Sequence, residues 1–292
     1  MGLVNINGLI VPLLTPMCED FEIDEISLKA LTARLMNKGV KNFFILSSLG
    51  EAFNIDKEKQ KKVIQLVSKI VQRGNILIGC FDDSTEKIIE KVRFAERYSD
   101  YCVINVPFSA LTNEVFFIDF FDELFKRTRA KIILCNDPFN FKRNIPIVGI
   151  DRIANWEKLI GVIDFSRNIT YFRSLSDYKQ SMQIFQGVEE QLVEAFSNNC
   201  SGLVAGLANI SPTYFLGINE GANISDINFF IRKEANIQRV MKAFFPFEKR
   251  IQSYKYVLAV EGITQPFHSK QIPSIAEEEK IHLEEFVKSS FA

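Results

Sequence analysis

Side chains able to do chemistry recur directly after short apolar segments of the chain. Asp82 and Asp83, then Asp137, Asp164 and Glu189, all stand at such positions. Carboxylates gathered at one face could bind a divalent cation. They could equally cap helix N-termini, where the helix dipole favours an acid, and we expect that role for Asp83 and Asp137. No metal ion or cofactor is predicted.

Cys135 stands in the same group of positions and could act as a nucleophile if its pKa were lowered. The two histidines, His268 and His282, lie near the C-terminus and offer no nearby group to activate it. A buried cysteine more often acts as a small apolar side chain, and that structural role is predicted for Cys135. Two histidines also exclude a metal site with three histidine ligands.

Eight apolar segments of strand length alternate with segments of helical period. Continuous apolar runs of this kind are typical of parallel strands buried on both faces. Eight strand–helix units favour a closed (β/α)8 TIM barrel over residues 1–225, followed by a C-terminal helical extension over residues 226–292. Helices are predicted at 227–262 and 275–291 of the extension. The predicted strands span residues 9–14, 42–46, 75–80, 101–106, 131–135, 159–163, 183–185 and 202–205.

In a TIM barrel the active site lies where the carboxyl ends of the strands meet. Five motifs stand at these ends, and together they resemble the pyruvate-dependent aldolase superfamily of dihydrodipicolinate synthase and N-acetylneuraminate lyase. The resemblance covers nearly the whole chain and is greatest to archaeal 2-keto-3-deoxygluconate aldolases. The motifs are Gly8-x-x-x-Pro12-x-x-Thr15-Pro16, Ser47–Glu51 at the family's G-T-T-G-E loop, Cys135–Pro138 at its Y-N-x-P, Gly161–Asp164 at its G-[IV]-K-D strand, and Gly202–Asn209.

The resemblance implies Schiff-base chemistry in the family, and this chain departs from it at the reacting groups. The family's lysine, which bonds covalently to a 2-oxo acid, corresponds to Ile163, and its proton-relaying tyrosine corresponds to Cys135. A second family tyrosine corresponds to Ser109, and a loop arginine falls at Asn140. Because isoleucine offers no nucleophile, the Schiff-base step is predicted to be lost.

The resemblance also implies a carboxylate-binding loop, which this chain retains in part. In the family this loop holds the substrate carboxylate through backbone N–H groups and hydroxyls, so a small 2-oxo acid or another carboxylate is the expected ligand. Ser48 keeps one of the family's two hydroxyls, whereas Leu49 removes the other. The predicted substrate-binding positions are Ser47, Ser48, Leu49, Gly50, Glu51, Asn140, Gly187 and Gly206.

Two other functions stay open. The chain could be an active carbon–carbon lyase that uses a displaced lysine such as Lys142, or different chemistry at Cys135 or the acidic residues. It could instead be a non-catalytic subunit that assembles with an active paralogue. Lys255, in the helical extension, is predicted to be a solvated or rim charge.

The composition argues against several broad classes of protein. A net charge of −1 over 292 residues gives no basic surplus for nucleic acid. No apolar run approaches the roughly 20 residues that cross a membrane, and no signal peptide is predicted. The five cysteines are odd in number and lack C-x-x-C spacing, which favours the reducing cytoplasm. The resemblance implies a homo-oligomer, a dimer or a tetramer.

Overall fold

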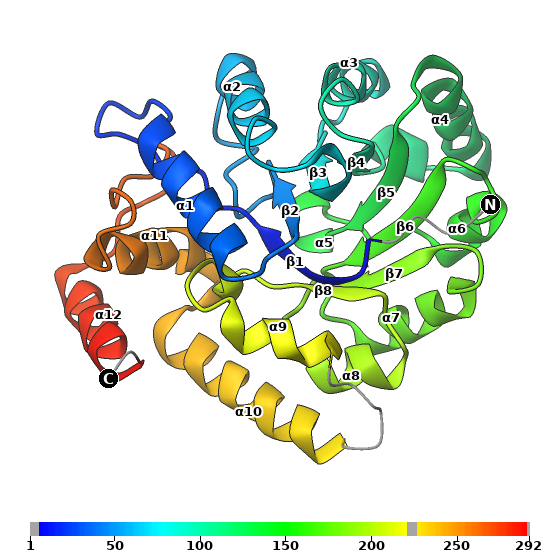
Figure 1. Ribbon diagram of the computed structural model, residues 1–292. Coiled ribbons are helices and arrows are strands. Elements are labelled where there is room, and N and C mark those ends of the chain that lie inside the picture. The colour runs from blue at the N-terminus through cyan, green and yellow to red at the C-terminus, as the bar shows by residue number, and fades with distance from the viewer. Residues whose placement is uncertain (1–5, 221–226, 291–292) are drawn as a thin grey trace.

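The protein is a closed barrel of eight parallel strands, each hydrogen-bonded to the next in chain order (Figure 1). The computed structural model describes residues 6–220 and 227–290. The predicted (β/α)8 TIM barrel is confirmed, and every predicted strand is present within two residues of its expected bounds. The strands are β1 (Gly8–Pro12), β2 (Asn42–Ile45), β3 (Ile76–Gly79), β4 (Tyr101–Ile104), β5 (Lys131–Asn136), β6 (Leu159–Asp164), β7 (Gln183–Gln186) and β8 (Gly202–Val204).

Helices surround the barrel, and α1 (Glu25–Asn37) illustrates why these segments are helical. Leu28, Leu31 and Leu35 recur at helical spacing, and all three are buried. Gly39 follows with a φ of +99°, a left-handed conformation that glycine adopts without strain. The other helices around the barrel are α2 (Lys57–Val67), α3 (Thr85–Ala95), α4 (Glu114–Arg127), α5 (Pro138–Phe141), α6 (Ile147–Ile153), α7 (Ile169–Leu175), α8 (Leu192–Ser197) and α9 (Thr213–Glu220).

Of the two aspartates expected to cap helices, only one does so. Asp137 caps α5, and its Oδ1 accepts the backbone N–H of Asn140 at 3.2 Å. The prediction for Asp83 was wrong, because α3 begins one residue later, after Ser84. There the carboxylate of Asp82 accepts the N–H groups of both Asp83 and Ser84, at 3.0 and 3.3 Å.

Within residues 227–290, the C-terminal extension contains three α-helices. A single helix over 227–262 was predicted, and this was wrong because Pro246, which has no backbone N–H, ends the first helix. A short 3-10 turn at Phe247–Lys249 follows before the chain becomes helical again. The proposed domain boundary at 225/226 lies outside the described residues. The helices are α10 (Ile227–Phe244), α11 (Arg250–Val260) and α12 (Glu277–Ser290).

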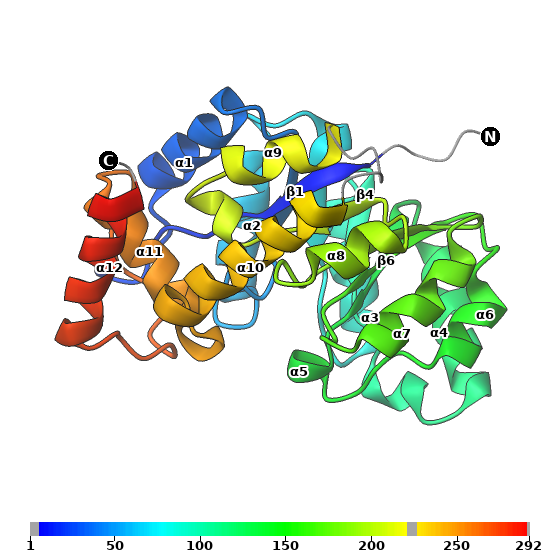
Figure 2. The same ribbon diagram turned by 90° about the horizontal axis from the view of Figure 1, so that it is seen from below.

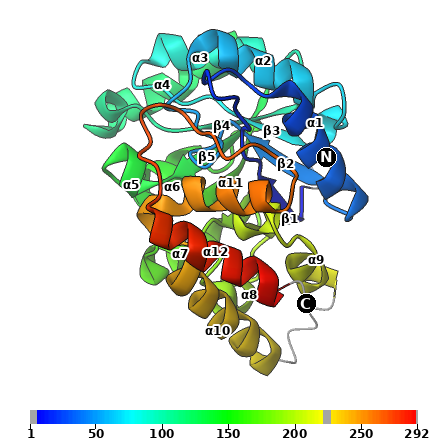
Figure 3. The same ribbon diagram turned by 90° about the vertical axis from the view of Figure 1, so that its left-hand side faces the viewer.

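The extension places one of its helices over the end of the barrel at which the strands have their carboxyl ends. Helix α11 crosses in front of the strands when the molecule is seen from that end (Figure 3). Helix α10 runs beside α8, and α12 packs on α11 (Figure 2). Among the described helices, none is long and apolar enough to cross a membrane.

Candidate functional site

The turn that follows β2, Ser47–Glu51, has a constrained backbone. The Ser47 hydroxyl accepts the N–H of Gly50 at 3.0 Å, and the Thr15 hydroxyl donates to the Gly50 carbonyl at 2.7 Å. A Cβ on Gly50 would lie 2.9 Å from the Leu13 carbonyl oxygen, so only glycine fits there. Glu51 has a positive φ of 61°, which is strained for a residue with a side chain. The turn is thus held in one shape from several directions.

This shape leaves hydrogen-bond donors available at the centre of the turn. Between residues 6–220 and 227–290, no hydrogen bond is found for the N–H groups of Ser48 and Leu49 or for the Ser48 hydroxyl. Ser48 is half-buried, whereas Ser47 is fully buried and committed to the turn. Consecutive unpaired N–H groups with a neighbouring hydroxyl are suited to an anion such as a carboxylate. Ser48 and Leu49 are therefore the positions of this loop that can contact a ligand directly.

Three other neighbouring strands, β5, β6 and β7, place apolar side chains at the same level of the barrel. Ile163 on β6 is in register with Cys135 on β5 and with Phe185 on β7. Ile163 and Phe185 are 0% exposed and Cys135 is 4% exposed. The ring of Phe185 also packs over Gly161, where a Cβ would lie 3.1 Å from it. Ile163, the position predicted to correspond to the family's lysine, therefore lies among an aromatic ring and a thiol.

The thiol of Cys135 is poorly suited to act as a nucleophile. Burial raises its pKa well above the ordinary value, and the nearby carboxylates of Asp137 and Asp164 raise it further. The fraction of thiolate, the reactive form, is consequently lower than in water. Activation would require a lowered thiol pKa, whereas the surroundings of Cys135 raise it.

Asp164, at the end of β6, forms its hydrogen bonds within the protein. The Asp164 carboxylate accepts the Asn136 amide at 2.7 Å and the Ser166 hydroxyl at 2.9 Å. Burial raises the pKa of Asp164 to about 6 despite these bonds. In the part of the chain that the structure describes, no group of three or more His, Cys, Asp or Glu side chains is arranged to hold a metal ion.

An aromatic cluster was missed by the sequence reasoning. It consists of Phe53, Phe81 and Phe141, which follow β2, β3 and β5 and so lie at the carboxyl end of the barrel. Their ring centroids are 5.5 to 5.8 Å apart, and Phe81 also meets Phe44 edge-on at 6.3 Å. Phe53 remains 48% exposed. The signal was a phenylalanine shortly after each of three strands.

A buried polar pair lies where β7 and β8 end. A Cβ on Gly206 would lie 2.9 Å from the Leu49 side chain and 3.1 Å from the Tyr254 ring, so this glycine allows helix α11 to approach the turn closely. Tyr254 donates its hydroxyl to Glu189 at 3.2 Å, and the N–H of Leu207 donates to the other oxygen at 2.9 Å. Burial raises the pKa of Glu189 to about 7. Leu49 and Gly206, both predicted site residues, are thus in contact.

Lys255 on α11 was predicted to be a solvated or rim charge, and this was wrong. Its side chain is 1% exposed, and it forms an ion pair with Glu51, which is 0% exposed. Lys255 also donates to the Phe267 carbonyl at 3.0 Å, while Glu51 accepts the Ser269 N–H at 2.7 Å. Burial lowers the pKa of Lys255, and Glu51 opposes that shift. Glu51 therefore anchors the turn to the extension.

The remaining predicted positions lie outside the turn. The amide of Asn140 is turned back onto the Asp137 carboxylate at 2.5 Å. Gly187 is covered by the ring of Phe165, since a Cβ there would lie 2.4 Å from it. Ser109 is exposed in the 3-10 turn after β4. Lys142 is exposed too, and it donates to the Phe139 carbonyl at 3.1 Å.

A closed (β/α)8 barrel whose candidate site lies at the carboxyl ends of its strands places this protein in the class of TIM-barrel proteins. The chain matches the Dihydrodipicolinate synthetase family over residues 5–290. This protein therefore belongs to that family, as its motifs suggested.

Individual relatives agree with this assignment. An uncharacterized DapA-like lyase of Thermococcus onnurineus is 24% identical over 80% of this chain and 82% of its own. A 4-hydroxy-tetrahydrodipicolinate synthase of Karelsulcia muelleri is 24% identical over 90% of each chain. The structure of dihydrodipicolinate synthase from Bacteroides thetaiotaomicron superposes with a TM-score of 0.90 at 22% identity, covering 99% of this chain and 100% of that one. That superposition supports the fold.

Proposed function

We propose that this family member has lost Schiff-base aldolase chemistry and binds a small carboxylate metabolite at the turn after β2. The observation that carries the proposal is Ile163, which is fully buried beside Cys135 and Phe185 at the position of the family's lysine. A Schiff base requires a primary amine, which no residue of β6 supplies. The N–H groups of Ser48 and Leu49 support the binding of a carboxylate.

A trapping experiment tests the loss of chemistry. The protein is incubated with pyruvate, and separately with 2-keto-3-deoxygluconate, then reduced with borohydride and weighed as the intact chain. We expect no adduct under conditions in which a lysine-bearing relative is converted completely. A stable adduct would contradict the proposal, and peptide mapping would identify the amine.

A displaced lysine is the second candidate, and burial favours Lys255 over Lys142. Lys142 is exposed, and its amine is turned to the Phe139 carbonyl. Lys255 is buried and its pKa is lowered by burial, which is the direction an imine-forming lysine needs. Its ion pair with Glu51 favours the charged ammonium over the neutral amine, however, and this is why loss of chemistry remains our first proposal. An adduct mapped to Lys255 would favour the second candidate.

The third candidate is a non-catalytic subunit that assembles with an active paralogue. A measurement of ligand binding distinguishes it from the first candidate. Pyruvate is titrated calorimetrically into the wild type, into Ser48→Ala and into Ser68→Ala, a control at the C-terminal end of α2. The removal of a hydroxyl that donates to a carboxylate should weaken binding by about tenfold or more, whereas the control should not change. If neither pyruvate nor any other small carboxylate binds to the wild type, assembly is left as the function.

The proposed setting is the cytoplasm. All five cysteines are free thiols in the structure, as expected in a reducing compartment.

A further inference from the structure

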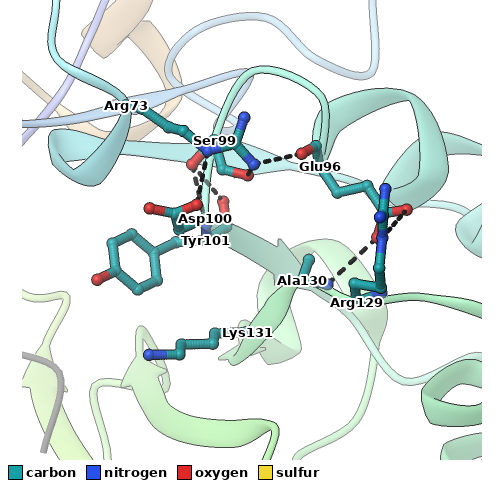
Figure 4. Close-up of a pocket in the computed structure, with 8 residues that line it drawn as sticks. All are labelled: Arg73, Glu96, Ser99, Asp100, Tyr101, Arg129, Ala130 and Lys131. Atoms are coloured by element: carbon teal, nitrogen blue, oxygen red, sulfur yellow. Dashed lines mark hydrogen bonds and ion pairs between the residues drawn. The ribbon is translucent and has the colours of Figure 1, made fainter.

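A pocket of about 460 Å³ opens at the amino ends of the strands, opposite the candidate site (Figure 4). Tyr101 and Lys131 are the first residues of β4 and β5, and Arg73 precedes β3. Three cationic and two acidic side chains line the pocket, so its formal charge is +1. Its volume is in the range of sites for small metabolites.

Most of the charges around the pocket are paired within the protein. Arg73 donates to the Asp100 carboxylate at 2.6 Å, and its other N–H groups reach backbone carbonyls of residues 96, 97 and 99. Glu96 accepts the backbone N–H groups of Arg129 and Ala130, at 2.7 and 3.2 Å. These contacts fix the wall of the pocket and satisfy both acids.

Tyr101 and Lys131 differ from the other charged and polar residues of the pocket, because their side-chain polar groups are not paired with any residue that the structure describes. They are in register on adjacent strands, and Figure 4 shows both side chains extending toward the same side, away from Arg129. Throughout 6–220 and 227–290, neither the Tyr101 hydroxyl nor the Lys131 amine has a hydrogen bond or ion pair. Tyr101 is only 7% exposed. The Tyr101 ring is therefore fixed by burial, while its hydroxyl and the Lys131 ammonium are both available to an oxyanion bound between them.

We propose that this pocket is a second binding site, for a small metabolite with a terminal oxyanion, either a carboxylate or a phosphate, held by Lys131 and Tyr101. The Tyr101 ring supplies an apolar wall, and its hydroxyl is a donor. Burial and the Asp100 charge raise the pKa of Tyr101, which keeps this donor protonated. The exposed Arg129, at 87%, adds positive charge at the rim. The site is independent of the turn after β2.

The test is calorimetric titration of the full-length protein with inorganic phosphate and, separately, with succinate. Saturable binding of one probe identifies the class of oxyanion. Lys131→Met should weaken that binding by about tenfold or more, because a charge-assisted hydrogen bond is lost. Tyr101→Phe keeps the ring, removes only the hydroxyl, and should weaken binding less. Lys41→Met is the matched control, an exposed lysine just before β2.

Three outcomes would overturn the proposal. The first is that neither probe binds saturably to the wild type. The second is that Lys41→Met weakens binding as much as Lys131→Met does. The third is that both pocket variants bind like the wild type, which would mean that the anion binds elsewhere on the surface. If Lys131→Met does not fold, which its thermal transition will show, Tyr101→Phe decides alone. Trapping of a Schiff base at the other end of the barrel would leave this result unaffected.

Discussion

The burial of the Glu189 carboxyl group makes the free energy of unfolding depend on pH. Burial raises its pKa from 4.5 to about 7. Between these values the folded chain therefore holds a proton that the unfolded chain has released. The free energy of unfolding must fall as the pH rises through this window, and a shift of this size corresponds to about 3 kcal/mol.

We expect Glu189→Gln to remove this part of the pH dependence. The variant should be more stable than the wild type above the raised pKa and similar to it below the ordinary value. Urea denaturation at several pH values measures the difference, with the exposed Glu278→Gln as control. A constant difference between wild type and Glu189→Gln at all pH values would contradict the expectation.

The residues of the site could be predicted from the sequence only where chemistry depends on residue type. That Ile163 cannot form an imine follows from its side chain alone. The burial of Lys255 could not be predicted, because a lysine in a helix is ordinarily solvated, and here the turn after β2 and the segment at Phe267 both approach its side chain. The same holds for Asn140, whose amide is turned onto Asp137 by the tight geometry of α5.

At the scale of elements, the ion pair between Glu51 and Lys255 joins the turn after β2 to helix α11. Both side chains are buried, so removal of one partner leaves an uncompensated charge inside the protein. We expect Lys255→Met to lower the free energy of unfolding by about 3–5 kcal/mol. The double variant Glu51→Gln with Lys255→Met should recover part of that loss, since neither charge is then buried alone.

Chemical denaturation of the single and double variants tests this expectation. The matched control is Lys57→Met, which removes an exposed pair with Glu90 at 3.2 Å and should cost less than about 1 kcal/mol. If Lys255→Met costs no more than Lys57→Met, the pair does not hold the turn. The pyruvate affinity of Lys255→Met reports separately whether the turn keeps its shape.

The strands were predictable and the helical extension was less so, for a physical reason. Strands of a closed barrel are buried on both faces, so their residues are nearly all apolar and each run stands out, as in Leu159–Asp164. Segments of the extension are half-exposed, and their apolar period continues across Pro246. The end of α10 is therefore set by the ring of this proline and not by any change in periodicity.

At the scale of the whole molecule, several large apolar side chains are exposed on neighbouring segments of the chain. The segments after β4 and β5 carry exposed apolar side chains, which we call the β4–β5 patch. The segments are packed together, because Arg143 lies over the Phe108 ring at 4.7 Å and Gly149 packs against Phe117. Large exposed apolar patches mark interaction surfaces. The patch consists of Phe108, Val115, Phe116, Phe139 and Val148, each more than half exposed.

We expect a second copy of this chain to cover the β4–β5 patch, giving the proposed dimer or tetramer. A charge in the middle of an apolar interface is desolvated without a partner, so Phe116→Asp should shift the protein toward the monomer. Sedimentation velocity measures the shift. The control is Ile26→Asp, which places the same charge on α1, at a side chain 83% exposed. A wild type that sediments as a monomer, or a Phe116→Asp variant that assembles like Ile26→Asp, would show that this patch has another role.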